Sequence, residues 1–329
     1  MRQSGGINDL IIEIFKKNAD GFVSGQDISN KIKISRTAVW KHIEGLRKMG
    51  YLIESIPSKG YRLVEMPDIL SIDEIRKTLQ AGIIGKDILF FDEVGSTNDV
   101  AMQRGASGMA EGLVVLSEGQ SHGKGRMGRT WVSPKNVNIY ISILLRPDIS
   151  PQYAPVMTMM SAISTARAIT EVTGLEATIK WPNDILIDRK KVSGILTEMN
   201  AEQERINYVV IGIGINVNMK REDFPVDLRA PATSLAECLG KRVDRMNLLL
   251  MLIRILEQDY DELKKDGIMS IFNRWRKGCD ILNRRIKVSL PGEEITGVAE
   301  DLTPEGGLMV RLDCGEKRVI YAGDVSIIR

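Results

Sequence analysis

The sequence has little cysteine and no long hydrophobic run. Its 329 residues include three cysteines, Cys238, Cys279 and Cys314, which lie far apart and form no Cys-x-x-Cys pair. This spacing argues against a disulfide framework or a structural zinc site, and it fits a reducing cytoplasm, where we expect the protein to work. No apolar run approaches the roughly 18 residues of a membrane span. The first residues lack the basic-then-apolar pattern of a secretory signal, so we expect neither export nor a membrane partner.

What the chain does have is enough apolar sequence for a sizeable core. Hydrophobic residues make up 43% and charged residues 27% of it, as in globular domains, and the length predicts two or three domains. The charge is uneven, because residues 1–65 hold 11 of the 45 basic residues but 7 of the 43 acidic ones. A basic N-terminal segment indicates contact with a polyanion, although an ordinary solvated surface is the alternative.

The N-terminal segment, residues 1–66, predicts a winged helix-turn-helix. Apolar residues spaced along one face predict a helix over residues 7–17. Ser24 and Ser35 are suitable N-caps for a second and a third helix, and Val39, Ile43 and Leu46 would form the buried stripe of the third. Two short strands around a turn at residues 57–60 would then make a basic hairpin. This order is typical of a recognition helix followed by a wing.

Six residues of this segment are candidates for DNA contact. Base edges would be read early on the third helix, by Arg36, Thr37 and Trp40. Phosphates, which supply affinity rather than sequence information, would be held by Lys41, Arg47 and Lys59. A protein-binding winged helix or a solvated charged helix face is the alternative, and the agreement of helix order, wing and charge favours DNA.

Residues 67–279 predict an enzyme-sized domain of mixed α/β or α+β type. Ser71 and Glu74 form a capping box at the start of a helix. From about Leu89 onward, apolar strand segments alternate with helices, including a long helix over residues 154–173. Residues 280–329 contain four short strand segments joined by turn sequences.

The segment from Gly123 to Arg129 carries the first chemical signal. It matches Gly-x-Gly-x-x-Gly, but another strand follows it instead of a helix, so a dinucleotide fingerprint is excluded by context. Its three glycines let backbone N–H groups approach a ligand, and Lys124, Arg126 and Arg129 add positive charge. The combination predicts a phosphate-binding loop, with an unliganded flexible basic loop as the alternative.

A second signal is the Lys-Trp-Pro-Asn-Asp segment at residues 180–184, with the Lys191 region a hairpin later. A lysine and an aspartate near a phosphate-binding loop suit metal-assisted nucleotidyl chemistry. The lysine neutralises phosphate charge, and Asp184 can hold Mg²⁺. A plain Pro-Asn turn between two strands explains residues 180–184 equally well.

Together these segments resemble the biotin operon repressor/biotin–protein ligase family along nearly the whole chain. The matching motifs, in the family's order, are Ser96-Thr97-Asn98, Glu118-Gly119-Gln120, residues 123–129, residues 180–184, residues 189–198 and residues 212–218. The resemblance implies a winged helix-turn-helix over residues 1–66, a biotin/lipoate-ligase-like catalytic domain over 67–279 and an SH3-like β-barrel over 280–329.

The resemblance also implies a two-step reaction. The carboxylate of biotin attacks the α-phosphate of MgATP, which gives biotinyl-5′-AMP and pyrophosphate. A lysine on a carboxyl-carrier domain, such as that of acetyl-CoA carboxylase, then displaces AMP. The adenylate would also act as corepressor, promoting a homodimer that binds operator DNA.

Site residues follow from the same resemblance. Those implied for biotin are Ser96, Thr97, Asn98, Gln120, Gly123, Lys124, Gly125, Arg126 and Lys191. Those implied for ATP or the adenylate are Arg126, Arg129, Trp131, Lys180, Asn183, Lys191 and Asn216. The catalytic residues would be Lys191, Arg126 and Asp184, with Asp184 also as the Mg²⁺ ligand. Gly212 and Gly214 would allow a close approach of ligand to backbone, and packing in the core is the alternative for Trp131.

Two positions depart from the family pattern. Lys124 stands where the loop commonly has arginine, and lysine keeps the charge but loses the planar fork. His122 follows Ser121 where the family usually has a small residue. Two alternatives to a biotin ligase remain, namely a lipoate–protein ligase, which shares the fold and the adenylate chemistry, and a ligand-sensing DNA-binding regulator without catalysis. The loop and residues 180–184 favour biotin, and the presence of Lys191 favours catalysis.

Overall fold

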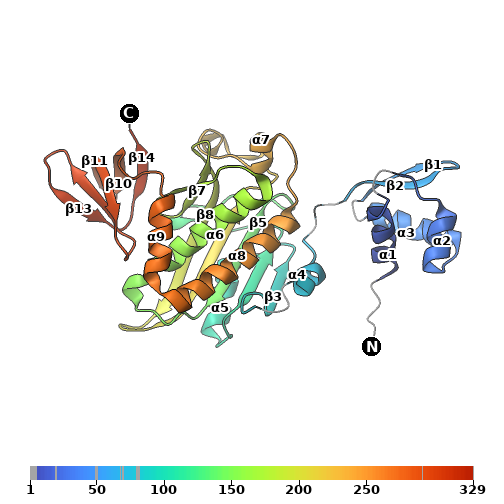
Figure 1. Cartoon of the computed structure of the whole chain (residues 1–329), viewed down its shortest axis with the longest axis horizontal. Helices are drawn as coiled ribbons and strands as arrows, with labels where there is room; N and C mark the ends of the chain where they lie inside the picture. Colours follow the sequence, from blue (N-terminus) through green and yellow to red (C-terminus); the bar gives the residue numbers. More distant parts are fainter. Residues whose placement is uncertain are drawn as a thin grey trace. The chain divides into compact units, whose positions relative to one another are not determined.

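The computed structural model describes residues 6–18, 21–48, 51–66, 68, 70–78, 82–290 and 292–328. The chain divides into two compact units, Met1–Ile69 and Leu70–Arg329 (Figure 1). Pro67, the predicted start of the catalytic domain, lies outside the described residues. The second unit contains both the predicted catalytic domain and the predicted small β domain, so the boundary at residue 279 stays a prediction.

The first unit has the predicted order of three helices and a hairpin. Its elements are α1 (Ile7–Lys16), α2 (Gly25–Ile32), α3 (Arg36–Lys48), β1 (Leu52–Ile56) and β2 (Gly60–Glu65). Both predicted caps are present: the Ser24 hydroxyl accepts the N–H of Asp27 at 3.0 Å, and the Ser35 hydroxyl accepts that of Ala38 at 3.2 Å. The predicted stripe of Val39, Ile43 and Leu46 is fully buried in the core of this unit.

A mixed seven-stranded sheet forms the centre of the second unit, in the order β3-β4-β5-β9-β8-β7-β6. Its strands are β3 (Asp87–Phe91), β4 (Leu113–Ser117), β5 (Ile139–Leu145), β6 (Thr178–Lys180), β7 (Asp184–Ile187), β8 (Lys190–Ala201) and β9 (Ile206–Ile215). The β3–β4 pair is parallel and the other neighbours are antiparallel. The predicted α/β catalytic core is confirmed.

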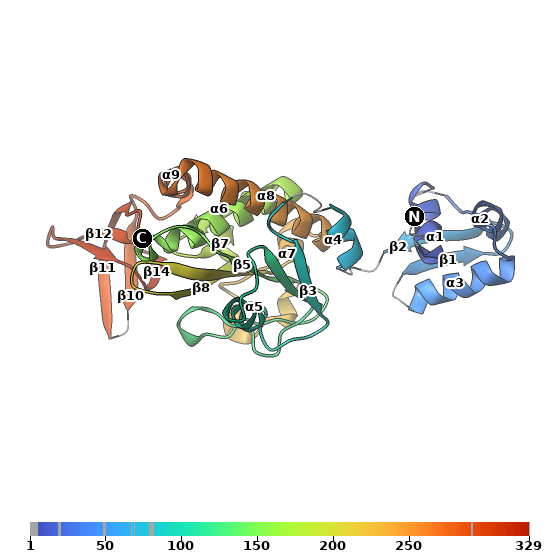
Figure 2. The ribbon, with the colours of Figure 1, turned by 90° about the horizontal axis from the view of Figure 1, so that it is seen from below.

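Helices cover both faces of this sheet. On one face lie α6 (Pro155–Thr173), α8 (Arg245–Asp266) and α9 (Ile268–Gly278), and on the other lies α5 (Thr97–Ala106) (Figure 2). Alternate residues of β4 therefore enter different cores: Val114 packs toward α6, and Val115 packs with Ala101 of α5. Burial on both faces explains why these strands are continuous apolar runs. The remaining helical segments are α4 (Ile72–Thr78), α7 (Leu235–Leu239), η1 (Arg126–Gly128), η2 (Pro151–Tyr153), η3 (Arg221–Asp223) and η4 (Val226–Leu228).

The C-terminal residues form the predicted small β domain, an antiparallel sheet in the order β13-β12-β11-β10-β14. Its strands are β10 (Arg285–Leu290), β11 (Glu293–Leu302), β12 (Leu308–Leu312), β13 (Lys317–Ile320) and β14 (Asp324–Ile327). This sheet shares one apolar core with the catalytic domain, and the buried Trp181 donates its indole N–H to the Gly306 carbonyl at 3.0 Å. Among the described residues, no helix has the length and apolar character that a membrane crossing requires.

Candidate active site

Glycines make the floor of a cavity on the α5 face of the sheet. Gly212 and Gly214 of β9 lie on the same face as Gly194 of β8, which is the partner of Gly214 in the strand register. Because side chains alternate across a strand, three glycines on one face leave open space above the sheet there. A cavity of about 420 Å³ occupies the space, which is the size of a small-ligand site.

One corner of the cavity is polar and buried. Ser96, Thr97 and Asn98 open helix α5 there. The backbone N–H and hydroxyl of Thr97 donate to Oε1 of Gln120 at 2.8 and 3.1 Å, while Nδ2 of Asn98 donates to Glu198 at 2.7 Å. The hydroxyl of Ser96 caps no backbone N–H of the helix. This corner therefore offers fixed donors and acceptors to a ligand that carries both.

Gly212 is needed for the packing of this corner. A Cβ at position 212 would lie 2.1 Å from Oδ1 of Asn98, an atom that already accepts the Ser142 hydroxyl at 2.6 Å. The glycine thus lets the Asn98 amide lie directly on the strand backbone. The family resemblance implies a close approach of ligand to backbone at Gly212, and in the structure the group that lies there is the side chain of Asn98.

The loop from Gly123 to Arg129 borders the same cavity. Lys124, Gly125, Arg126 and Arg129 line it. Gly123 has a different part, because its Cβ would lie 2.4 Å from the Trp131 carbonyl and its own carbonyl accepts the Trp131 N–H at 2.8 Å. Gly123 therefore holds the base of the loop closed, which explains the glycine without a ligand contact.

Each basic side chain of this loop has a partner. Lys124 donates to Asp99 of α5, Arg129 pairs through two nitrogens with Asp324 of β14, and Nη1 of Arg126 donates to Oδ1 of Asn183 at 3.0 Å. These partners come from α5, from the small β domain and from the β6–β7 turn. These contacts hold the loop in place. A ligand with more negative charge could replace the side chains that now bind its basic groups.

The ion pairs and burial also shift the pKa values of these groups. The hydrogen bond to Asp99 raises the pKa of Lys124, and the bond to Asp324 raises that of Arg129. In return, Arg129 lowers the pKa of the Asp324 carboxyl. Burial lowers the pKa of Arg126, which as a guanidinium stays protonated. The loop is therefore cationic at neutral pH.

Lys191 and Asp184 face each other across the β7–β8 hairpin. Nζ of Lys191 lies 2.6 Å from Oδ1 of Asp184 and 5.3 Å from the ring centre of Trp131. Lys180 of β6 and Asn183 of the β6–β7 turn line the cavity as well. The strand register thus brings the two sequence signals, residues 180–184 and the Lys191 region, to one end of the cavity.

Trp131 lies over the glycine floor rather than in the core. A Cβ at Gly214 would lie 2.5 Å from its indole ring. The buried indole N–H has no hydrogen-bond partner within the part of the chain that the structure describes. An unused buried donor is costly, so this N–H is available to a ligand. Nearby, the buried Asn216 donates Nδ2 to the Thr233 carbonyl at 3.1 Å while lining the cavity.

In the first unit, most of the predicted DNA-contact residues are exposed. These are Arg36, Thr37, Trp40, Lys41 and Lys59, with the large Trp40 side chain 52% exposed. Arg47 differs, because its guanidinium donates to the Ile53 carbonyl at 2.7 and 3.1 Å and to Glu44 at 2.6 Å. Arg47 thereby joins α3 to β1, and its contact with phosphate stays a prediction.

Four residues that hold side chains of the site in place are named by no sequence prediction. Asp99 and Asp324 hold the loop, Ser142 holds Asn98, and Arg245 forms a buried ion pair with Glu118 beside the cavity. Glu118 belongs to a predicted motif, but no role was attached to it. Asp99, Asp324, Ser142 and Arg245 lie outside every motif. Each could be identified only from its contact with a residue distant in the sequence.

Comparison with known proteins gives a consistent result for each part of the chain. Family models match residues 9–62 as an HTH domain, residues 90–216 as the biotin/lipoate A/B protein ligase family and residues 281–327 as the biotin protein ligase C-terminal domain. The bifunctional ligase/repressor BirA of Bacillus subtilis is 38% identical over 317 residues, which are 96% of this chain and 97% of that protein.

Two further relatives agree. The bifunctional ligase/repressor BirA of Escherichia coli is 30% identical over 97% of this chain and 98% of its own length. The solved structure of the Aquifex aeolicus biotin protein ligase in complex with biotin and ATP superimposes with a TM-score of 0.62 and 28% identity, over 74% of this chain and 99% of that one.

Proposed function

This chain belongs to the family of bifunctional biotin–protein ligases and repressors, and we propose how its cavity and its helix-turn-helix carry out the two activities. The protein joins biotin to a carrier protein at the expense of ATP, by way of biotinyl-5′-AMP, and represses transcription. One observation carries the assignment of the site: a polar corner, a cationic loop and the Lys191–Asp184 pair border the same cavity.

We assign the polar corner to the ring end of biotin. The ureido group of biotin has two N–H donors and a carbonyl acceptor. The corner matches these with the hydroxyls of Ser96 and Thr97 and the amides of Asn98 and Gln120. With the rings held there, the acid chain extends along the glycine floor toward Lys191.

Charge neutralisation is the main task in the first step. A carboxylate must approach an α-phosphate, and both are negative. Lys191 and Arg126 would bind these oxygens, and positive groups aimed at developing charge are among the strongest catalytic effects. Lys124 and Arg129 would exchange their carboxylate partners for the phosphates, which closes the loop over the ligand. Trp131 and Asn216, with Lys180 and Asn183, would hold the nucleotide.

The residues present fit a Mg²⁺ ion that is bound largely by phosphate. Among the described residues, no cluster of three or more His, Cys, Asp or Glu side chains could hold a metal alone. Mg²⁺ is commonly held by one or two carboxylates together with substrate phosphates. Asp184 lines the cavity and would supply such a carboxylate. When bound, the ion would neutralise phosphate charge.

A second cavity gives a route for the acceptor lysine. It has a volume of about 610 Å³ and shares Arg126, Asn183 and Ile195 with the first. Its outer wall includes Tyr321 of the small β domain and Met199 of β8, both exposed. We propose that the lysine of the biotin carboxyl-carrier domain, such as that of acetyl-CoA carboxylase, enters here and reaches the activated carboxyl at Arg126.

We further propose that two copies pair through β8 and bind operator DNA together in the cytoplasm. On one side of β8, its partner β7 extends only to Gly194. No described strand pairs with residues 196–201 on that side, and an open strand edge is a template for pairing. A symmetric dimer would present two recognition helices to two half-sites.

Ligase activity is tested directly by incubating the protein with biotin, MgATP and a carrier domain. Mass spectrometry should then find one biotin on one carrier lysine. Exchange of labelled pyrophosphate into ATP, measured with biotin and with lipoate, separates the two possible acids. Exchange supported by lipoate alone would reject the assignment of the polar corner.

Gly212→Ala is expected to weaken biotin binding about tenfold or more. The new Cβ would displace the Asn98 amide and break its bonds to Ser142 and Glu198, and each such bond contributes about 1 kcal/mol. Equilibrium binding of biotin measures the effect. Gly278→Ala is the matched control, because its Cβ would meet Ile179 at an ordinary 3.5 Å. Unchanged affinity in Gly212→Ala would separate Asn98 from biotin binding.

A stable biotinyl-adenylate analogue is expected to raise both dimer formation and operator affinity, the latter about 5- to 150-fold, the usual range of coupling between sites. A ligand that prefers the dimer must increase the dimer population. Sedimentation and DNA binding at one fixed salt concentration measure both quantities. If neither responds to the analogue, the DNA-binding unit is not regulated by biotin.

A further inference from the structure

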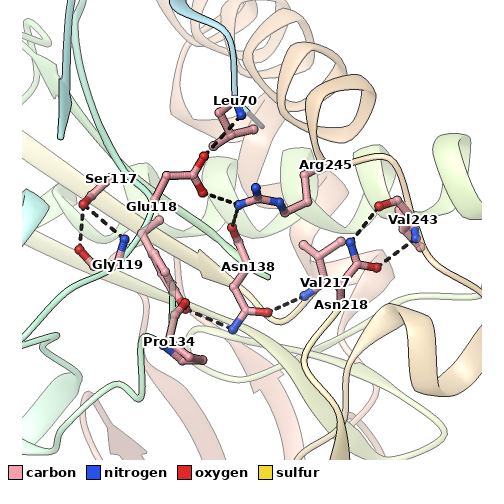
Figure 3. A network of polar contacts seen from close by, with 11 residues as sticks. Leu70, Ser117, Glu118, Gly119, Pro134, Asn138, Val217, Asn218, Val243 and Arg245 are labelled. Carbon is pink, nitrogen blue, oxygen red and sulfur yellow. Dashed lines mark hydrogen bonds and ion pairs between the residues drawn. The ribbon is translucent and has the colours of Figure 1, made fainter. Parts of the chain in front are cut away.

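Glu118 and Arg245 form a buried ion pair within a network of polar contacts (Figure 3). Nη1 of Arg245, the first residue of α8, lies 2.6 Å from Oε2 of Glu118, and their side chains are 0% and 5% exposed. A buried pair contributes little net stability compared with a well-packed apolar pair, because both charges lose their water. Its presence here calls for a reason other than stability.

The pair fixes three chain segments at once. Glu118 follows β4, and Nη1 of Arg245 also donates to the carbonyl of Asn138 at 2.9 Å. The side chain of Asn138 accepts the N–H of Val217 at 2.9 Å and donates to the hydroxyl of Tyr140 at 3.0 Å. Figure 3 shows this continuous path from Glu118 through Arg245 to Asn138 and Val217.

Each fixed segment carries a cavity residue within two positions. Gln120 is two residues after Glu118, Tyr140 is two residues after Asn138, and Asn216 directly precedes Val217. All three cavity residues line the site. Lys191 and Arg126, which would neutralise charge on the reacting oxygens, have other partners. Lys191 of β8 contacts Asp184, and Arg126 of the loop contacts Asn183.

We propose that Glu118 and Arg245 are positioning residues for substrate binding, which set Gln120, Tyr140 and Asn216 around the bound molecule. This rests on the proposed function of the cavity as the biotin and nucleotide site. The pair holds substrate-binding residues and does not contact Lys191 or Arg126. Its loss therefore changes KM more than kcat.

The variant that tests this is E118Q/R245M, which removes both charges. The Leu70 N–H, which Glu118 accepts at 3.2 Å, keeps an oxygen acceptor because a glutamine side chain retains a carbonyl, and methionine fills the space of the arginine stem. Replacing both partners together avoids leaving one buried charge uncompensated, which is the strongly destabilising case. The expected result is a folded protein with a lower melting temperature, because the Asn138 carbonyl loses its Arg245 donor, and a KM for biotin raised about tenfold, with kcat changed less than about threefold.

A second ion pair, with a buried carboxylate and a partly exposed arginine, supplies the control. Arg274 of α9 lies 2.8 Å from the buried Asp259 of α8, on the face of the sheet opposite α5 and the cavity. The variant D259N/R274M should leave the KM for biotin unchanged. If E118Q/R245M does not fold, the same kinetics on E118Q below its melting temperature decide the question.

Two outcomes would overturn the proposal: a wild-type KM in the folded E118Q/R245M variant, or an equal rise of KM in the control. Failure of the function itself looks different, since the wild type would then show no biotin-dependent exchange of pyrophosphate into ATP.

Discussion

Lys191→Ala is expected to lower the rate of biotinyl-adenylate formation by about 10²–10³, the usual effect of removing one group that stabilises developing charge. The side chain of Lys191 is 32% exposed and contacts Asp184 and the Trp131 ring, so we expect the variant to fold. Biotin-dependent exchange of labelled pyrophosphate into ATP measures the first step alone. Circular dichroism and a melting curve establish that the variant is folded.

Lys190→Ala is the matched control for this experiment. Lys190 is the neighbouring residue, with its side chain exposed at the β7–β8 turn. Lys190→Ala removes the same charge at almost the same place in the chain, so a general effect of lost positive charge would appear in both variants. Near-normal adenylation by folded Lys191→Ala would remove Lys191 from its catalytic role.

A shortened chain of residues 67–329 is expected to keep its ligase activity and to lose sequence-specific DNA binding. Leu70–Arg329 is a compact unit of its own, and every residue assigned to the cavity lies in it. Specific DNA binding is typically about 10³–10⁷ tighter than non-specific binding, and this advantage should disappear.

Trp40→Ala in the full chain gives the complementary test. Trp40 is exposed on α3, so its removal should reduce operator affinity and leave transfer of biotin to the carrier unchanged. Both activities are measured on the same preparations, by DNA binding at fixed salt and by carrier biotinylation. A shortened chain that folds but cannot biotinylate the carrier would mean that the first unit takes part in catalysis.

Local signals in the sequence were sufficient for much of the fold. Ser24 and Ser35 cap helices because a cap acts within three residues of itself. Val39, Ile43 and Leu46 fall on one helix face by spacing alone. The sheet strands could be predicted because both faces are buried, which makes each a continuous apolar run. The motifs around Gln120, residues 123–129 and Lys191 could likewise be identified, since each is contiguous.

Contacts between distant segments could be decided only by the tertiary structure. Arg245 and Glu118 are 127 positions apart, and Arg129 and Asp324 are 195 apart, so neither pair leaves a local pattern. Arg47 has the same helical spacing as a phosphate-binding residue, and only the return of β1 beside it shows that its guanidinium is occupied. A sequence pattern records the preference of a segment for helix, strand or turn. The partner of a charged side chain depends instead on which segments packing brings together.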